Sequence, residues 1–287
     1  MNTHKVIISA DSTCDLTPDV VAKYGILIDP MPILLGDRSC LDGVDVFQQD
    51  VFDYTNSTGQ LPKTSAQNTA HYEEYFARLT EDGSSVIHFN ISASMSGSYN
   101  AANMAALDME NVHVIDSINL STGIGLLVIK AAEMAADDSP ADQIADYIER
   151  MKHRVDASFV IDTLVNLHKG GRCSTVALLG ANALKLKPCI EVKNGAMAVV
   201  KKYRGKMGNV LLEYAKDRLA DLQSVDPDRI FITHTCTQPG LVQPVREYIE
   251  SLGYFNDIVE TTAGCTVSAH CGPNTLGVLF VRKQEID

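Results

Sequence analysis

The sequence has no pair of cysteines at the C-x-x-C spacing that zinc sites and redox motifs use. Its seven cysteines are odd in number and widely scattered, at positions 14, 40, 173, 189, 236, 265 and 271. This distribution disfavours both a disulfide framework and a tetrahedral zinc site. We therefore expect reduced thiols in a reducing cytoplasm. Cys265 and Cys271 flank His270, but small buried thiols are common, so a catalytic cysteine there is the less favoured interpretation.

Four short enzyme signatures are also missing. The sequence contains no H-E-x-x-H, no G-x-S-x-G, no G-x-x-x-x-G-K-[ST] and no G-x-G-x-x-G. These patterns mark zinc proteases, α/β-hydrolases, phosphate-binding loops and dinucleotide-binding folds. The sequence therefore lacks the main signature of each of these four common classes. Among the eight histidines, His270 lies in an expected loop, 263–273, flanked by glycines. A lone histidine is more often structural, but one in such a loop can donate to a bound anion.

Targeting and membrane signals are equally scarce. The first ten residues lack a basic region followed by an apolar segment and a cleavage site, and they read directly into a strand. The longest apolar stretch, 124–136, contains Lys130 and Glu133 and falls short of the roughly 20 residues that cross a bilayer. We expect a cytoplasmic protein, without stable membrane insertion, in which this stretch forms a buried helix.

Charge is abundant but unevenly distributed. The formal net charge of −12 disfavours nucleic-acid binding. Residues 165–206, here called the basic block, nevertheless carry nine lysines and arginines against a single acid, Glu191, a local net charge of +8. The block is either a solvated face or a site for an anionic ligand or an acidic partner. Its cationic residues are Lys169, Arg172, Lys185, Lys187, Lys193, Lys201, Lys202, Arg204 and Lys206.

The first half of the chain alternates strand, loop and helix. Strands are expected at 5–9, 85–91 and 112–115, and helices at 18–24, 68–80, 98–107 and 123–136. An extended segment broken by two prolines covers 26–35. Repeated units of this kind predict a doubly wound α/β domain with a parallel sheet. Ligands of such sheets bind at the carboxyl ends of the strands.

The second half has a different pattern. Strands are expected at 159–163, 189–193, 197–202, 229–233 and 275–281, and helices at 174–186, 209–222 and 240–252. Asn194-Gly195 is a strong hairpin signal, which favours a mixed sheet. A length of 287 residues is more than one domain usually has. We therefore expect an N-terminal doubly wound α/β domain at 1–155 and a C-terminal mixed-sheet α/β domain at 156–287.

Two loops place hydroxyl groups before expected helices. Pro62-Lys63-Thr64-Ser65 precedes the helix near residue 68, and residues 92–98 join a strand to the helix near Ser98. The free N–H groups and the dipole of a helix N-terminus bind anions, and serine or threonine hydroxyls add donors without charge. A carboxylate or a phosphate would fit. Taken singly, each loop is more often an ordinary helix cap.

These motifs together resemble the DegV family. The resemblance covers essentially the whole chain, with eight segments in the family's order: Asp11-Ser12-Thr13-Cys14-Asp15-Leu16, Thr64-Ser65, Ser94-Met95-Ser96-Gly97-Ser98-Tyr99, Val114-Ile115-Asp116-Ser117, Lys169-Gly170-Gly171-Arg172, Leu186-Lys187-Pro188, Arg204-Gly205 and His270-Cys271-Gly272-Pro273. It implies a two-domain DegV-like fold with the ligand at the domain interface.

DegV proteins are bacterial cytoplasmic fatty-acid carriers, some of which present the acyl chain to a separate, ATP-dependent fatty acid kinase. The resemblance thus implies a lipid-binding carrier for a long-chain fatty acid such as palmitate, with no catalytic residue, metal or cofactor of its own. It implies that Thr64 and Ser96 hydrogen-bond the fatty-acid carboxylate, with His270 helping to orient it. Arg172 and Arg204 would lie near the head group or the transferred phosphoryl group.

Some residues depart from the family's usual pattern. After Thr64 the chain reads Ser65-Ala66-Gln67, where the family usually has Ser-Gln-Pro, and the loop around His270 has Ala269 and Asn274 where threonine and glycine are commoner. A second interpretation stays open, because the family is structurally related to dihydroxyacetone kinases: an enzyme or substrate-binding subunit for a small phosphorylated or hydroxylated metabolite. A regulatory or structural module is a third.

Overall fold

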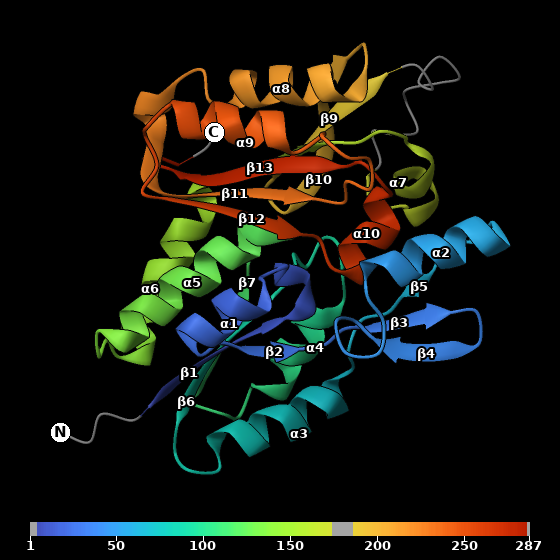
Figure 1. Cartoon of the computed structure of the whole chain (residues 1–287). Helices are drawn as coiled ribbons and strands as arrows, with labels where there is room; N and C mark the ends of the chain where they lie inside the picture. The colour runs from blue at the N-terminus through green and yellow to red at the C-terminus, as the bar shows by residue number, and fades with distance from the viewer. Residues whose placement is uncertain (1–4, 174–185, 286–287) are drawn as a thin grey trace.

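A four-stranded parallel sheet forms the first layer of the molecule. The structure, a computed structural model, describes residues 5–173 and 186–285 (Figure 1). The strand order is β2-β1-β6-β7, and every neighbouring pair is parallel. The strands are Val6–Asp11 (β1), Leu27–Asp29 (β2), Ser85–Asn90 (β6) and Val112–Asp116 (β7).

Helices cover both faces of this sheet (Figure 1). Helices α3 (Thr69–Thr80) and α4 (Ser98–Ala105) pack on one face, and α1 (Pro18–Tyr24), α5 (Thr122–Ala136) and α6 (Ala141–Met151) lie on the other. Local chemistry sets their ends. The Thr17 hydroxyl accepts the Val20 N–H at the start of α1, and Gly25 ends it in the left-handed region at φ +63°, a conformation that glycine adopts readily. Short 3₁₀ turns cover Ser12–Cys14 (η1) and Lys152–Arg154 (η2).

A small antiparallel sheet inserts between β2 and α3 in the chain. Its order is β4-β3-β5, with strands Pro32–Leu35 (β3), Arg38–Leu41 (β4) and Lys63–Thr64 (β5). Helix α2 (Gln48–Thr58) follows β4. The sequence predicted an extended segment at 26–35 but neither this sheet nor α2. We call β3, β4, β5 and α2 the small-sheet unit.

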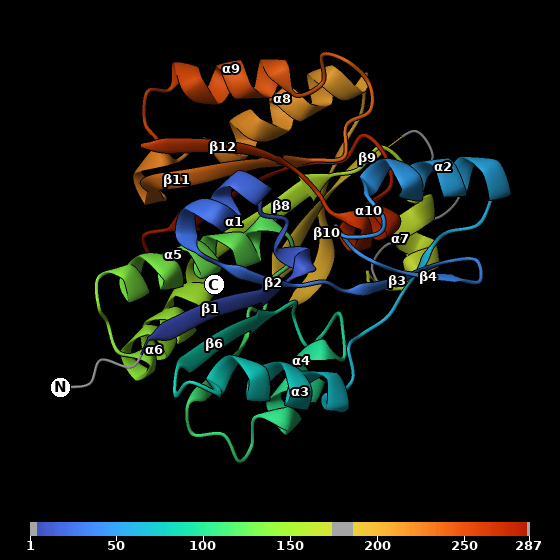
Figure 2. The same ribbon diagram turned by 60° about the horizontal axis from the view of Figure 1, so that its bottom comes forward.

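A six-stranded mixed sheet forms the other layer. Its order is β10-β9-β8-β13-β11-β12, antiparallel except between β11 and β12. Helices α8 and α9 cover one face, as Figure 2 also shows. The strands are Val155–Val160 (β8), Lys187–Lys193 (β9), Ala196–Tyr203 (β10), Val225–His234 (β11), Asp257–Thr262 (β12) and Leu276–Arg282 (β13); the helices are Val165–Gly170 (α7), Met207–Arg218 (α8), Gln243–Ser251 (α9) and Cys265–Cys271 (α10), with a 3₁₀ turn at Leu222–Ser224 (η5).

The sequence predicted an α/β fold in which a parallel sheet is followed by a mixed sheet, and the structure confirms this fold class. The predicted hairpin is also present, since Asn194 and Gly195 join β9 to β10 with φ angles of +50° and +79°. The helix expected at 174–186 falls on residues outside the described ranges, apart from Leu186. The division into domains 1–155 and 156–287 stays a prediction; β8 begins at Val155.

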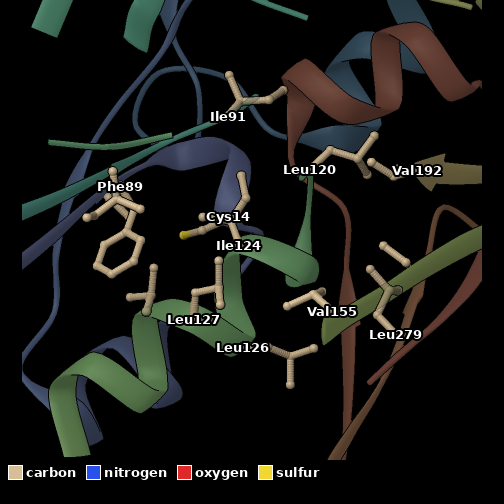
Figure 3. Close-up of a cluster of buried hydrophobic side chains, with 14 of the residues drawn as sticks. Cys14, Phe89, Ile91, Leu120, Ile124, Leu126, Leu127, Val155, Val192 and Leu279 are labelled. Atoms are coloured by element: carbon tan, nitrogen blue, oxygen red, sulfur yellow. The ribbon is translucent and has the colours of Figure 1, made fainter. Parts of the chain in front are cut away.

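Helix α5 lies between the two sheets and is buried on nearly every side. Its Ile124 and Leu127 lie toward Cys14 and Phe89 of the parallel-sheet layer, whereas Leu126 lies toward the mixed-sheet layer (Figure 3). Fully burying one such side chain contributes about 1.5–3 kcal/mol. One continuous hydrophobic core therefore joins the two layers. Within the described residues, no helix is long and apolar enough to cross a membrane.

Candidate functional site

A cavity opens where the parallel sheet, the small-sheet unit and the mixed sheet meet. It encloses about 690 Å³ of space between its atoms, counting the part open to solvent. Nine apolar or sulfur-containing side chains line much of its wall: Met31, Ala66, Ile91, Met95, Leu120, Leu167, Met197, Val267 and Cys271. The polar lining residues include Thr13, Thr64, Ser96, Arg172, Thr266 and His270. The cavity is thus an apolar space with a few polar groups, typical of a small-molecule site.

A second, smaller cavity adjoins the first. It shares Leu120, Val267 and Cys271 with the first and has about 330 Å³ of space between its atoms, again counting the part open to solvent. The remaining wall comes from the mixed sheet and its loops, including Phe159 and Leu279. We call this space the inner cavity. Because three residues line both, the two spaces lie next to each other.

Thr64 and His270 form the polar centre of the site. The Thr64 Oγ1 and His270 Nε2 atoms lie 2.9 Å apart. Burial lowers the pKa of His270 to about 4, with a further lowering from the Arg172 charge. The imidazole is therefore neutral at pH 7, with one nitrogen that donates a hydrogen bond and one that accepts. A hydroxyl and a neutral imidazole can hold a carboxylate by hydrogen bonds without a fixed ion pair.

The local structure around these two residues differs from the sequence prediction. Thr64 lies in β5, opposite Ile33, and not at a helix N-terminus; α3 begins five residues later, capped by Asn68. His270 lies in helix α10, so the predicted loop at 263–273 is wrong. No side chain near α10 in the sequence signals the helix, because carboxylates from far along the chain cap it.

Two aspartates from the first fifth of the chain cap α10. Asp42 accepts the N–H groups of Cys265 and Thr266 at 2.8 and 2.9 Å. Asp15 accepts the N–H of Gly264 at 2.8 Å and a hydrogen bond from the Ser121 hydroxyl. Burial raises the pKa of Asp15 to about 8. Since the first N–H groups of a helix have no partner within it, these contacts hold α10 in place.

The hydrophobic side of α10 packs on the small-sheet unit. Cys265 and Ala269 share a buried cluster with Ile33, Val51 and Phe52. Thr64 belongs to the same unit, so one substructure positions both members of the Thr64–His270 pair. The sequence did not predict this unit, so it also did not identify Asp42 as the residue that caps α10.

Ser96 lines the cavity from the loop between β6 and α4. Its Oγ accepts the Ser98 N–H at 3.2 Å and lies 3.0 Å from the Ser98 Oγ. The residue is therefore a local cap and a lining residue at once, so the two sequence interpretations do not exclude each other. The same loop is tied to the β9–β10 hairpin, because Ser92 Oγ donates to the Gly195 carbonyl at 2.7 Å.

The Lys169-Gly170-Gly171-Arg172 segment brings a cation to the site. Arg172 lines the cavity, and its guanidinium donates to the Gly170 carbonyl at 2.7 Å and to the Met95 carbonyl at 3.5 Å. Gly170 lies against the imidazole: a Cβ atom there would stand 2.3 Å from the His270 Nδ1. A glycine is required at this position for α7 to approach α10 so closely.

Arg204 lies apart from the other predicted residues. It is exposed, follows β10 and is absent from the lining of the cavity within the described residues. Some cations of the basic block already have acidic partners, since Lys187 pairs with Asp162 and Lys201 with Asp217. Lys185 lies outside the described residues.

The described residues give little support for a metal ion or a reactive thiol at the site. In residues 5–173 and 186–285, no group of three or more histidine, cysteine or acidic side chains could hold a metal ion. Burial raises the pKa of the Cys271 thiol to about 12 and also raises that of Cys265. Both thiols are therefore protonated near pH 7, and a protonated thiol is a poor nucleophile.

Comparisons with known proteins point to one family. A family model described as DegV matches residues 5–283. A DegV domain-containing protein of Clostridium acetobutylicum is 31% identical over 97% of this chain and 99% of its own, and one of Clostridium perfringens is 29% identical with the same coverage.

Solved structures with the same fold were described with fatty acids. A DegV family protein of Thermus thermophilus, described by its fatty acid binding, superposes with a TM-score of 0.89 at 22% identity, covering 97% of this chain and 99% of its own. A stearic acid-binding protein of Eubacterium ventriosum superposes with a TM-score of 0.84 at 25% identity, covering 98% of both chains.

Proposed function

Because this chain belongs to the DegV family, we propose that it binds a long-chain fatty acid in the cavity and presents the carboxylate to a separate fatty acid kinase. The carboxylate would accept hydrogen bonds from Thr64 and Ser96, with His270 orienting it. Phosphoryl transfer from ATP would be the work of the kinase, so the chain itself is a carrier. Its place of action would be the bacterial cytoplasm.

One observation carries the proposal: the cavity combines a polar centre at Thr64 and His270 with a largely apolar wall, and it adjoins the inner cavity. Burial of each methylene contributes about 0.8 kcal/mol, so about 14 methylenes supply on the order of 11 kcal/mol before association costs. The tail would therefore supply most of the affinity. The hydroxyls would mainly fix the position of the head group.

The position and charge of Arg172 support the proposal that the carboxylate is phosphorylated in this cavity. Its guanidinium lines the cavity and carries a permanent positive charge. An acyl phosphate has more negative charge than a carboxylate, and charge-assisted hydrogen bonds to phosphate are among the stronger ones in proteins. Arg172 would therefore stabilise the phosphorylated product more than the bound fatty acid.

The alternatives fit the cavity less well. An enzyme for a small phosphorylated metabolite needs a mainly polar cavity, whereas nine apolar or sulfur-containing side chains line this one. A purely structural module needs no deep cavity. The lining therefore favours the lipid carrier.

Native mass spectrometry of the protein purified from a bacterial host tests the proposal. We expect a bound fatty acid of roughly 14 to 18 carbons, since a long apolar space gains affinity from every methylene that it buries. Organic extraction should release the same acid. A protein that carries no lipid and binds a polar metabolite tightly would refute the carrier function.

A further inference from the structure

Thr266 has a buried hydroxyl with no hydrogen-bond partner among the described residues. It lines the cavity and is only 7% exposed, and its Oγ1 has no hydrogen-bond partner anywhere in the part of the chain that the structure describes. Other buried threonines do have partners: Thr122 and Thr233 bond to each other at 2.6 Å, Thr235 donates to the Gly272 carbonyl and Thr261 to the Asp15 carbonyl. Thr266 therefore differs from these other buried threonines.

An unpaired buried hydroxyl destabilises the fold, because it has lost its bonds to water and gained none. Valine has nearly the same shape as threonine and would fill this position without that penalty. The hydroxyl at position 266 thus brings no evident benefit to the unliganded fold. A polar atom of a ligand in the cavity would give it a partner.

The position of Thr266 indicates where on the ligand that atom would lie. Thr266 precedes His270 by four residues, so both lie on one face of α10, separated by about 6 Å along its axis. Val267, the next residue, belongs to both cavities. Since Thr266 lines the same cavity as His270, an acyl chain held at His270 can pass Thr266 within its first few carbons.

The side chain can turn toward such a ligand. Its backbone is fixed, because Asp42 accepts the Thr266 N–H, but threonine in a helix adopts two χ1 rotamers that change where Oγ1 points. Thr13 adds a second hydroxyl to the same wall. Its Oγ1 donates to Asp11, which leaves its lone pairs free to accept from a ligand hydroxyl.

We propose that Thr266, aided by Thr13, forms a second polar subsite that recognises an oxygen substituent near the carboxyl end of the acyl chain, such as the hydroxyl of a hydroxy fatty acid. This rests on the proposed function and narrows it. The chain would bind 2-hydroxy or 3-hydroxy fatty acids in preference to unsubstituted ones. The carboxylate would still be held at Thr64, Ser96 and His270.

The test measures the affinity of delipidated protein for palmitic, 2-hydroxypalmitic, 3-hydroxypalmitic and 16-hydroxypalmitic acids by calorimetry. We expect 2-hydroxypalmitic or 3-hydroxypalmitic acid to bind about fivefold more tightly than palmitic acid, the effect of one hydrogen bond. The 16-hydroxy acid, which carries its hydroxyl at the far end, should show no gain. Thr266→Val should abolish the preference and leave the affinity for palmitic acid equal or higher.

Ser268→Ala is the matched control. Ser268 is a buried hydroxyl residue on the same helix, but it bonds to the Ala263 carbonyl and Gln48 and does not line the cavity. This variant should keep the preference. The inference is overturned if neither 2-hydroxy nor 3-hydroxy acid is preferred, if the preference survives Thr266→Val, or if that variant weakens all four acids equally. Failure to bind any of the four would instead refute the proposed carrier function.

Discussion

The Thr64 hydroxyl and the His270 imidazole lie 2.9 Å apart, although 206 residues separate them in the sequence. Thr64 stands in the short strand β5 and His270 near the end of α10. β5 is part of the small-sheet unit and α10 packs on it, with the Asp42 carboxylate accepting two N–H groups from the first turn of α10. The polar centre of the site thus depends on a contact between two remote parts of the chain.

Removing either hydroxyl that we propose to bind the carboxylate should weaken lipid binding more than folding. Thr64→Ala and Ser96→Ala should each lower the affinity for palmitic acid by about 1–2 kcal/mol, the scale of one hydrogen bond to a charged group. Calorimetry gives the affinity, and thermal unfolding gives the stability. A lower melting temperature with unchanged affinity would show that the residue is only structural. Ser96 gives the clearer distinction, because its Oγ also accepts the N–H of Ser98, the first residue of α4.

Arg204 should affect transfer rather than binding. It is exposed and outside the cavity lining, so Arg204→Ala should leave fatty-acid affinity nearly unchanged. If its guanidinium meets the kinase or the developing phosphoryl charge, acyl-phosphate formation should fall roughly tenfold, about 1.4 kcal/mol. ATP consumption with a cognate kinase measures this. Unchanged turnover would remove Arg204 from the site, and lost lipid affinity would place it in the head-group pocket.

Gly170 should be needed for the position of His270. A methyl group at residue 170 would stand 2.3 Å from the His270 Nδ1, so Gly170→Ala should displace the imidazole and weaken palmitic acid binding about tenfold or more. Gly171→Ala is a matched control. Gly171 has a φ of +70° but no atom within 4 Å of the added carbon, so this change should cost about 1 kcal/mol of stability with little effect on binding. Equal affinities for the two variants would contradict the prediction.

Asp15 should make the protein less stable as the pH rises. Burial raises its folded-state pKa from 3.8 to about 8, so between these values the folded state keeps a proton that the unfolded state has lost. The free energy of unfolding should therefore fall with pH across this window, by up to about 1.4 kcal/mol per pH unit for one proton. Asp11 acts in the same direction up to about pH 6. Urea titrations at several pH values measure the slope.

The variant Asp15→Asn separates this effect from the other titrating groups. An asparagine can still accept the Gly264 N–H but carries no proton to lose. Its slope between pH 6 and pH 8, where Asp11 no longer contributes, should be clearly flatter than that of the unsubstituted protein. Identical slopes would show that Asp15 does not titrate in this range.

Much of the fold follows from local sequence patterns. The alternation of short apolar runs with amphipathic segments predicted the strands β1, β6 and β7 and helices such as α3, whose Tyr72, Tyr75 and Phe76 are buried together. The Asn194-Gly195 pair predicted the β9–β10 turn. These features depend on neighbouring residues, so a single sequence is sufficient to find them.

The rest depends on contacts that no local pattern contains. Helix α10 has seven residues and no capping side chain of its own, and it forms because Asp15 and Asp42 supply partners from more than 200 residues away. The short strand β5 exists through its pairing with β3. Family resemblance indicated Thr64, Ser96, Arg172 and His270, but the partnerless hydroxyl of Thr266 becomes visible only when the cavity wall is assembled.

The burial of α5 between the two sheets has a consequence for how a ligand enters and leaves. A hinge motion that parted the sheets would expose Ile124, Leu126 and Leu127 to water together, at a cost of several kcal/mol. Exchange by that route would be rare. Faster exchange would need only local movement at the edge of the cavity, while the two layers stay joined. Under the proposed function, α5 would therefore keep the two layers joined, while local motion at the edge of the cavity would set how long the ligand stays bound.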